Sequence, residues 1–148
     1  MSNQSAVTKR FIDSLYKNVK MGADSIIDLM PKVKDTAMRE EMTAELEHYE
    51  KFAKRSRDIL FRHGDEPKEE SFMTKAMTKM GIAMNTMMDT TTSHIADMMI
   101  QGATMGVTDT TKLVREYENT PCSEDALALA RDAIKYQEES IERLKKFL

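Results

Sequence analysis

Glu45 and His48 are the residues whose types and spacing most clearly suggest chemistry, because they lie three positions apart in a segment with helical periodicity. This spacing places both side chains on one face of a helix, where a carboxylate and an imidazole can reach the same metal ion. The pair is therefore the first candidate for a metal site, with Fe, Mn or Zn as the ion that such ligands would hold.

Glu45 also lies on the apolar stripe of its segment, as Gln137 does on the stripe of the last segment. If both are buried, each needs a partner, because an unpaired buried polar group costs about 1–3 kcal/mol. One interpretation is a structural hydrogen-bond network, Glu45 with Gln137 or Glu45 with His48, that fixes the alignment of the helices. The other is that these side chains are ligands or an acid–base pair. The sequence has no Ser-His-Asp or Cys-His arrangement, so it favours a protein without catalytic activity.

Five predicted helices would carry these side chains, and they are recognised from apolar residues that recur at intervals of three and four. They cover about residues 5–30, 36–63, 71–88, 93–118 and 124–147. Pro31 ends the first helix, Asp35 and Ser123 can cap the second and the last, and Gly64 follows the end of the second. In the fourth helix, the residues expected to face inward are Ile95, Met98, Gly102, Met105 and Leu113.

Length and composition indicate one all-α domain over residues 1–148. The chain is 41% hydrophobic and 32% charged, and its 5 Gly and 3 Pro disfavour a turn-rich β fold. Short turns join the first helix to the second and the fourth to the fifth, which makes each pair antiparallel. The connection between the second and fourth helices is long enough to cross the bundle and contains the methionine-rich helix over 71–88. We therefore predict an antiparallel four-helix bundle with an extra helix in the crossover.

This arrangement resembles the ferritin-like superfamily, and two segments carry the likeness, Glu45 to His48 and the closing segment Gln137 to Leu144. The resemblance implies a ferritin-like fold over essentially the whole chain. Di-metal members place one Glu on each of two helices and a Glu-x-x-His on each of the other two. Apart from Glu45 and His48, the corresponding positions in this chain are Met21, Gln101, Gln137 and Ser140.

These substitutions argue against a standard di-metal centre. Counting along the helices places Met21, Glu45, Gln101 and Gln137 at a common level, roughly 12–15 Å from one end of the bundle. Two ferrous ions bring about four positive charges, which the superfamily offsets with four carboxylates, whereas this level retains one. The resemblance therefore implies a ferritin-like protein whose di-metal site is largely lost.

A displaced mononuclear site is a further metal hypothesis. One or two helical turns from the level of Glu45, toward the same end of the bundle, three carboxylates and one imidazole come from three helices. These candidates are Asp24, Glu41, Asp97 and His94. The alternative is that they are solvated or paired polar residues near the bundle end.

Gly22 and Gly102 occupy predicted helix interiors, where each costs about 1 kcal/mol relative to Ala. They either permit close helix contact or leave room for a ligand in the bundle centre.

The charge and the cysteine content limit the partners. The net charge is −3 with acids and bases interspersed, so we expect no nucleic-acid partner. The single cysteine excludes an intramolecular disulfide, and the lack of a membrane-spanning run or signal peptide predicts no membrane partner and a cytoplasmic location. A second apolar edge of the 71–88 helix, Ile82 and Met88, predicts a homo-oligomer, most simply a dimer.

Three functions remain open from the sequence. The first is a non-catalytic oligomeric or interaction protein that has lost its metal site, and for it we expect no cofactor. The second is a metal-binding protein or carboxylate-bridged metal oxidase that uses Glu45 and His48. The third is a small-molecule binder that uses the bundle centre.

Overall fold

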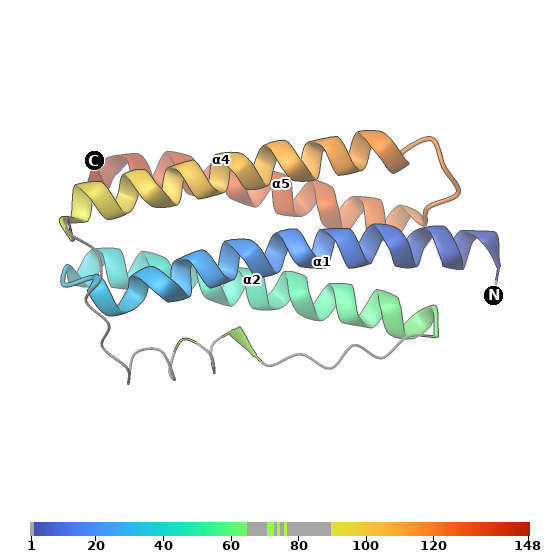
Figure 1. Ribbon diagram of the computed structural model, residues 1–148, viewed down its shortest axis with the longest axis horizontal. Coiled ribbons are helices and arrows are strands. Elements are labelled where there is room, and N and C mark those ends of the chain that lie inside the picture. Colours follow the sequence, from blue (N-terminus) through green and yellow to red (C-terminus); the bar gives the residue numbers. More distant parts are fainter. Residues whose placement is uncertain (1, 65–70, 73, 75, 77–89) are drawn as a thin grey trace.

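The computed structural model describes residues 2–64, 71, 72, 74, 76 and 90–148, and within them it is all-helical, with four long helices (Figure 1). These are α1 (Asn3–Leu29), α2 (Thr36–Arg62), α4 (Thr92–Tyr117) and α5 (Glu124–Leu144). Short 3₁₀ turns, Met30–Lys32 and Lys145–Phe147, follow α1 and α5. The predicted bounds of these four helices are confirmed to within three residues, whereas most of the predicted helix over 71–88, including Ile82 and Met88, lies outside the described residues.

The helix ends follow the local chemistry of the sequence. Asp35 caps α2, as predicted, because its carboxylate accepts a hydrogen bond of 2.9 Å from the backbone N–H of Met38. Gly64 follows the end of α2 with φ of +88°, a conformation that other residues rarely adopt. Ser123 precedes α5, but its hydroxyl donates to the carboxylate of Asp125 and makes no capping bond to the helix backbone, so the predicted side-chain cap is wrong there.

The core lies between the inner faces of the four helices. In the ring of principal contacts, α1 packs on α2 and α4, and α5 packs on α4 and α2. The largest fully buried side chains come from all four helices and from the described part of the segment between α2 and α4. They include Phe11, Ile12 and Leu15 of α1, Met38, Met42 and Leu46 of α2, Ile95 of α4, Leu127 and Leu129 of α5, and Phe72.

The inward face of α4 differs from the predicted one by about one residue. Ile95 and Leu113 are buried as expected, but Met98 is 37% exposed and Met105 is 60% exposed. Their inward places are taken by Met99 and Ala103. The rotation brings Met98, Met105 and Gly102 to the surface of α4 beside α1.

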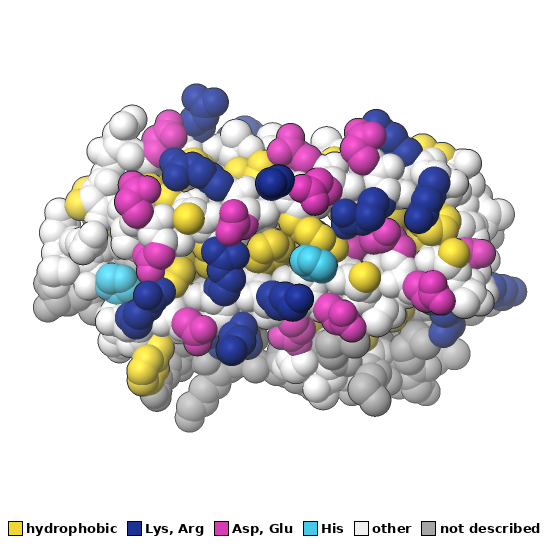
Figure 2. Space-filling model, turned by 180° about the vertical axis from the view of Figure 1, so that it is seen from behind, with side chains coloured by type: hydrophobic (Ala, Val, Ile, Leu, Met, Phe, Trp, Pro, Cys, Tyr) yellow, Lys and Arg dark blue, Asp and Glu magenta, His cyan; other side chains and the backbone are white. Residues whose placement is uncertain are grey.

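The outer surface carries charges of both signs. On the face shown in Figure 2, Lys and Arg side chains alternate with Asp and Glu side chains, and neither sign forms a continuous patch. Among the described residues, no helix has the combination of length and apolar character that crossing a lipid bilayer requires.

Candidate functional site

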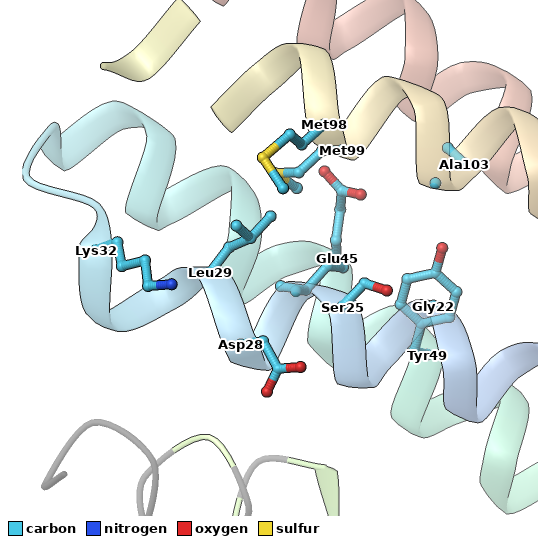
Figure 3. A pocket seen from close by; sticks show the side chains of 12 residues that line it. Gly22, Ser25, Asp28, Leu29, Lys32, Glu45, Tyr49, Met98, Met99 and Ala103 are labelled. Carbon is cyan, nitrogen blue, oxygen red and sulfur yellow. The ribbon is translucent and has the colours of Figure 1, made fainter. Parts of the chain in front are cut away.

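A cavity of about 440 Å³ opens between α1 and α4 and has α2 as its floor (Figure 3). Its walls are largely apolar and include Ile26 and Leu29 of α1 and Met98 and Met99 of α4. The floor is polar, because Glu45 and Tyr49 of α2 reach up into the cavity between the other two helices. Other lining residues include Gly22, Ser25, Asp28, Lys32, Gly102 and Ala103.

A smaller hollow of about 70 Å³ continues the cavity along the α1–α4 groove. The two share Gly22, Ser25 and Gly102, and the hollow ends at Gln137 of α5. Met21, which is 60% exposed, and Met105 line the hollow. We use the name α1–α4 cleft for the cavity and this hollow together.

Glu45 is a deeply buried titratable group of the cleft, with only 2% of its surface exposed. The hydroxyl of Ser140 donates a hydrogen bond of 2.6 Å to its Oε1, but Oε2 receives no hydrogen bond from the described residues. Burial raises the pKa of Glu45 to about 8; Glu41 raises it further through a shared proton and charge repulsion, while Ser140 and Arg143 lower it. Glu45 therefore holds its proton at pH 7.

Tyr49 and Gln137 form the second buried polar contact of the cleft. The amide Nε2 of Gln137 donates a hydrogen bond of 3.3 Å to the hydroxyl of Tyr49, while Oε1 of Gln137 has no partner among the described residues. Burial raises the pKa of Tyr49 to about 12, so its hydroxyl stays neutral across the physiological range. The predicted network around Glu45 and Gln137 thus exists, but Glu45 pairs with Ser140 and Gln137 with Tyr49.

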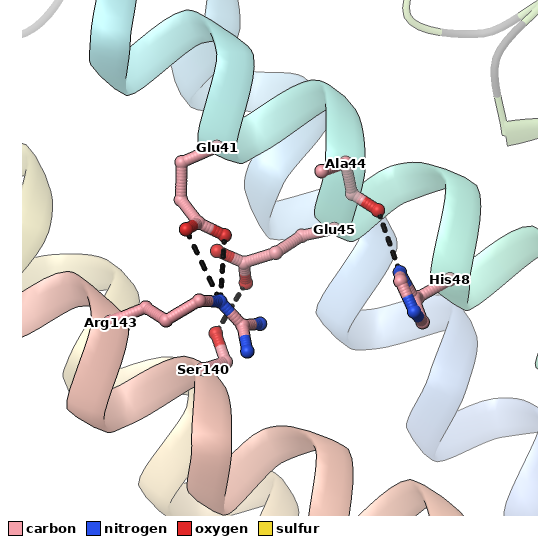
Figure 4. A network of polar contacts seen from close by, with 6 residues as sticks. All are labelled: Glu41, Ala44, Glu45, His48, Ser140 and Arg143. Carbon is pink, nitrogen blue, oxygen red and sulfur yellow. Dashed lines mark hydrogen bonds and ion pairs between the residues drawn. The ribbon is translucent and has the colours of Figure 1, made fainter.

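Arg143 of α5 reaches across to α2 and lies beside Glu41 and Glu45 (Figure 4). Its Nε lies 3.2 Å from Oε1 of Glu41, whose side chain is only 9% exposed, and its guanidinium lies over the Tyr136 ring at 5.0 Å from the centroid. This ion pair neutralises the carboxylate next to Glu45.

The side chains of Glu45 and His48 do not point toward a common position. His48 turns away from Glu45, stacks on Tyr136 with ring centroids 4.2 Å apart, and donates from Nδ1 to the backbone carbonyl of Ala44 at 3.1 Å (Figure 4). Three residues on a helix leave the two side chains about 60° apart around the axis. That angle is enough to direct Glu45 to the interior and His48 to the α2–α5 edge, so the two side chains do not converge on one position in this structure, and their joint role as metal ligands stays a prediction.

The other predicted members of the common layer are corrected in the same way. Met21 and Gln101 are exposed, and Gln101 donates to Asp97 of its own helix at 3.2 Å. Gly22 and Ala103 line the cavity with Glu45 instead. The level along the helices was therefore estimated well, whereas the rotation about each helix axis was not.

The displaced-site candidates occupy separate surroundings. Asp24 pairs with Lys20 at 3.3 Å, Glu41 pairs with Arg143, Asp97 accepts from Gln101, and His94 lies in the first turn of α4. Within the described part of the chain, no three His, Cys, Asp or Glu side chains come together as a metal site. Around Glu45, the neighbouring polar groups are the Ser140 hydroxyl, the Tyr49 phenol and the Glu41 carboxylate, which is already paired with Arg143. Two carboxyl groups, one of them held by an arginine, do not fit a di-metal centre that uses four.

The glycines explain how the polar side chains are accommodated. A β-carbon on Gly106 would overlap the amide of Gln137, and one on Gly22 would lie 3.2 Å from the Tyr49 ring. A β-carbon on Gly102 would meet nothing within 4 Å. Gly106 and Gly22 therefore make room for the buried polar pair, whereas Gly102 leaves open space at the mouth of the cleft.

Gly102→Ala and Gly106→Ala form a matched pair on one helix, because both remove the same backbone freedom of the unfolded chain. We expect Gly102→Ala to raise the free energy of unfolding by about 0.5–1 kcal/mol. Gly106→Ala should be less stable than Gly102→Ala by about 1–2 kcal/mol, because it displaces the Gln137 amide from Tyr49. Urea unfolding of both variants measures the difference, and equal stabilisation by both would contradict this packing.

Comparison with known proteins finds no family model, no curated protein and no solved structure that matches the chain.

Proposed function

We propose that this chain is an antiparallel, ferritin-like four-helix bundle that has lost its di-metal site and binds a small organic molecule, without catalysis, in the α1–α4 cleft. The observation that carries the proposal is the carboxyl group of Glu45, which is 2% exposed and reaches into a cavity of about 440 Å³ (Figure 3). Glutamate side chains are rarely buried to this degree in a protein interior.

The connections between the helices support the antiparallel, ferritin-like part of the proposal. The segments between α1 and α2 and between α4 and α5 are short, while α2 and α4 are separated by residues 63–91. In Figure 1, the first short turn lies at one end of the molecule and the other short turn at the opposite end. One long crossover between two tight pairs is the connectivity of ferritin-like bundles.

The composition of the cleft supports ligand binding. Binding sites for small molecules are mostly apolar concavities with a few placed polar groups, and this cleft combines Met, Leu and Ile walls with one carboxyl group and one phenol. Among the described residues, no histidine lines the cavity, and Glu45, to which the Ser140 hydroxyl donates, holds its own proton at pH 7 and is not a free base for nucleophilic catalysis. These residues supply binding and orientation of a ligand.

Methionine methyl NMR tests the proposal, because Met98 and Met99 line the cavity while Met38 and Met42 are fully buried elsewhere in the core. We expect octan-1-ol or octylamine to shift the methyl resonances of Met98 and Met99 and to leave those of Met38 and Met42 in place.

Gly102→Leu should block this response by filling the open space at the mouth of the cleft, whereas Gln101→Leu, on the exposed face of α4, should keep it. The proposal fails if neither compound shifts Met98 or Met99. It also fails if the protein is a dimer that Gly102→Leu dissociates, because a second copy of the chain would then cover the cleft.

A further inference from the structure

We infer that the ligand of the α1–α4 cleft is a primary amine on an apolar body, with its ammonium group on the carboxylate of Glu45 and its body along Met98, Met99 and Leu29. This inference rests on the proposed function and specifies the chemistry of that same site. It follows from the hydrogen-bond inventory, the charges and the walls of the cleft.

The buried polar groups at the floor of the cleft lack donors once Glu45 is ionised. The Ser140 hydroxyl donates to Oε1 of Glu45, and the Gln137 amide donates to the Tyr49 hydroxyl. When the proton that Glu45 shares with Glu41 is lost, two buried oxygens remain without a donor among the described residues, Oε2 of Glu45 and Oε1 of Gln137. A ligand that brings N–H donors satisfies them, whereas a carboxylate or a carbonyl ligand would bring further acceptors.

The charges around Glu45 favour a cation in this position. Glu41 and Arg143 neutralise one another, so an ionised Glu45 would leave one negative charge without a counter-charge. In the free protein that charge is avoided because Glu45 keeps a proton, and an ammonium ion can replace the proton. Two tyrosines with raised pKa, Tyr49 and Tyr136, also face Glu45. The cavity is further lined by one acid, Asp28, and one base, Lys32, on the side of α1.

The walls select an organic cation over a metal ion. The Ser25 hydroxyl donates to the backbone carbonyl of Met21, and Asp28 points away from Glu45 (Figure 3). Around Glu45 and Tyr49 the interior of the cavity offers mainly Met98, Met99 and Leu29, which cannot replace the water shell of a small inorganic cation. The same side chains suit an alkyl or aromatic body, and methionine adapts its shape to such a body readily.

Binding of an ammonium ion must release the proton of Glu45, which gives the inference a measurable signature. The ion binds the ionised form of a carboxyl whose pKa is about 8, so the affinity should rise more than tenfold between pH 6 and pH 8. Calorimetric titration in two buffers of different ionisation enthalpy measures the released proton directly.

The experiment compares octylamine, octan-1-ol and octanoate on the wild-type chain and on Glu45→Gln at pH 6 and pH 8. We expect octylamine to bind the wild-type chain best, more tightly at pH 8 and with proton release. Glu45→Gln should lose the preference for octylamine and the pH dependence while still binding octan-1-ol.

Two results separate failure of this inference from failure of the proposed function. If octan-1-ol or octanoate binds as well as octylamine, or if Glu45→Gln keeps the preference for the amine, the cleft binds ligands but the amine assignment is wrong. If none of the three compounds shifts the Met98 and Met99 methyl resonances, both the assignment and the proposed function are overturned.

Discussion

Between pH 5 and pH 8, the wild-type chain is expected to lose about 3 kcal/mol of its free energy of unfolding that the Glu45→Gln variant keeps. The pKa of Glu45 is raised from 4.5 to about 8 on folding, so between these values the folded chain binds one more proton than the unfolded chain. Stability from this group is therefore complete below about pH 4.5 and is lost as the pH rises toward 8. The glutamine does not titrate, and its carbonyl can still accept the hydrogen bond from Ser140.

Urea unfolding followed by far-UV circular dichroism from pH 5 to pH 9 measures this difference, with the free energy of unfolding of each variant plotted against pH. Glu47→Gln is the matched control, because Glu47 lies on the exposed side of the same helix. Its curve should run parallel to that of the wild-type chain. Parallel curves for wild type and Glu45→Gln as well would show that Glu45 ionises freely in the folded protein and would contradict its burial.

The helices could be predicted closely because their signals are local. Pro31, Asp35 and Gly64 mark chain breaks through their own backbone chemistry, and the apolar period between such breaks leaves little freedom in the bounds. The all-helical architecture with four long helices followed from these local signals and from the scarcity of Gly and Pro.

The rotation of the helices about their axes could not be predicted with the same accuracy. On α4, the adjacent Met98 and Met99 are equally apolar, so the sequence pattern does not tell which of them faces inward. Position along a helix depends only on the rise per residue, but one residue of rotation turns a side chain by about 100°. This is why the predicted level of Met21 is close to that of Glu45, although Gly22, and not Met21, lines the cavity with Glu45.

The partners of the buried polar groups depend on interhelical geometry that a single sequence does not contain. Glu45 and Gln137 were recognisable because both interrupt apolar stripes, and they are indeed buried. The sequence paired them with each other or with His48, but one helical turn separates the two actual contacts, Ser140 for Glu45 and Tyr49 for Gln137. Ser140 and Tyr49 also lie at stripe positions, so the same signal could have identified them.

The second large effect is expected from Arg143→Met, which removes the counter-charge of Glu41 and keeps an apolar side chain over Tyr136. Two neighbouring carboxyls, Glu41 and Glu45, then remain in a mostly buried place without a cation. Removing one partner of a fully buried ion pair costs about 3–5 kcal/mol, and because Arg143 is partly exposed we expect about 2 kcal/mol at pH 8. The loss should be smaller at pH 5, where Glu45 is neutral in the folded protein.

A double-mutant cycle separates the charge from the packing in this prediction. Adding Glu41→Gln to Arg143→Met should recover most of the lost stability, because the orphaned carboxylate is then gone. Arg55 and Asp132 provide the matched control, since this ion pair also joins α2 to α5, at 2.9 Å, but both side chains are exposed. Arg55→Met should therefore cost less than about 1 kcal/mol. If Arg143→Met costs no more than Arg55→Met, or if Glu41→Gln does not restore stability, then Arg143 does not hold the charge balance beside Glu45. In that case, the argument for an uncompensated charge at the floor of the cleft would fail as well.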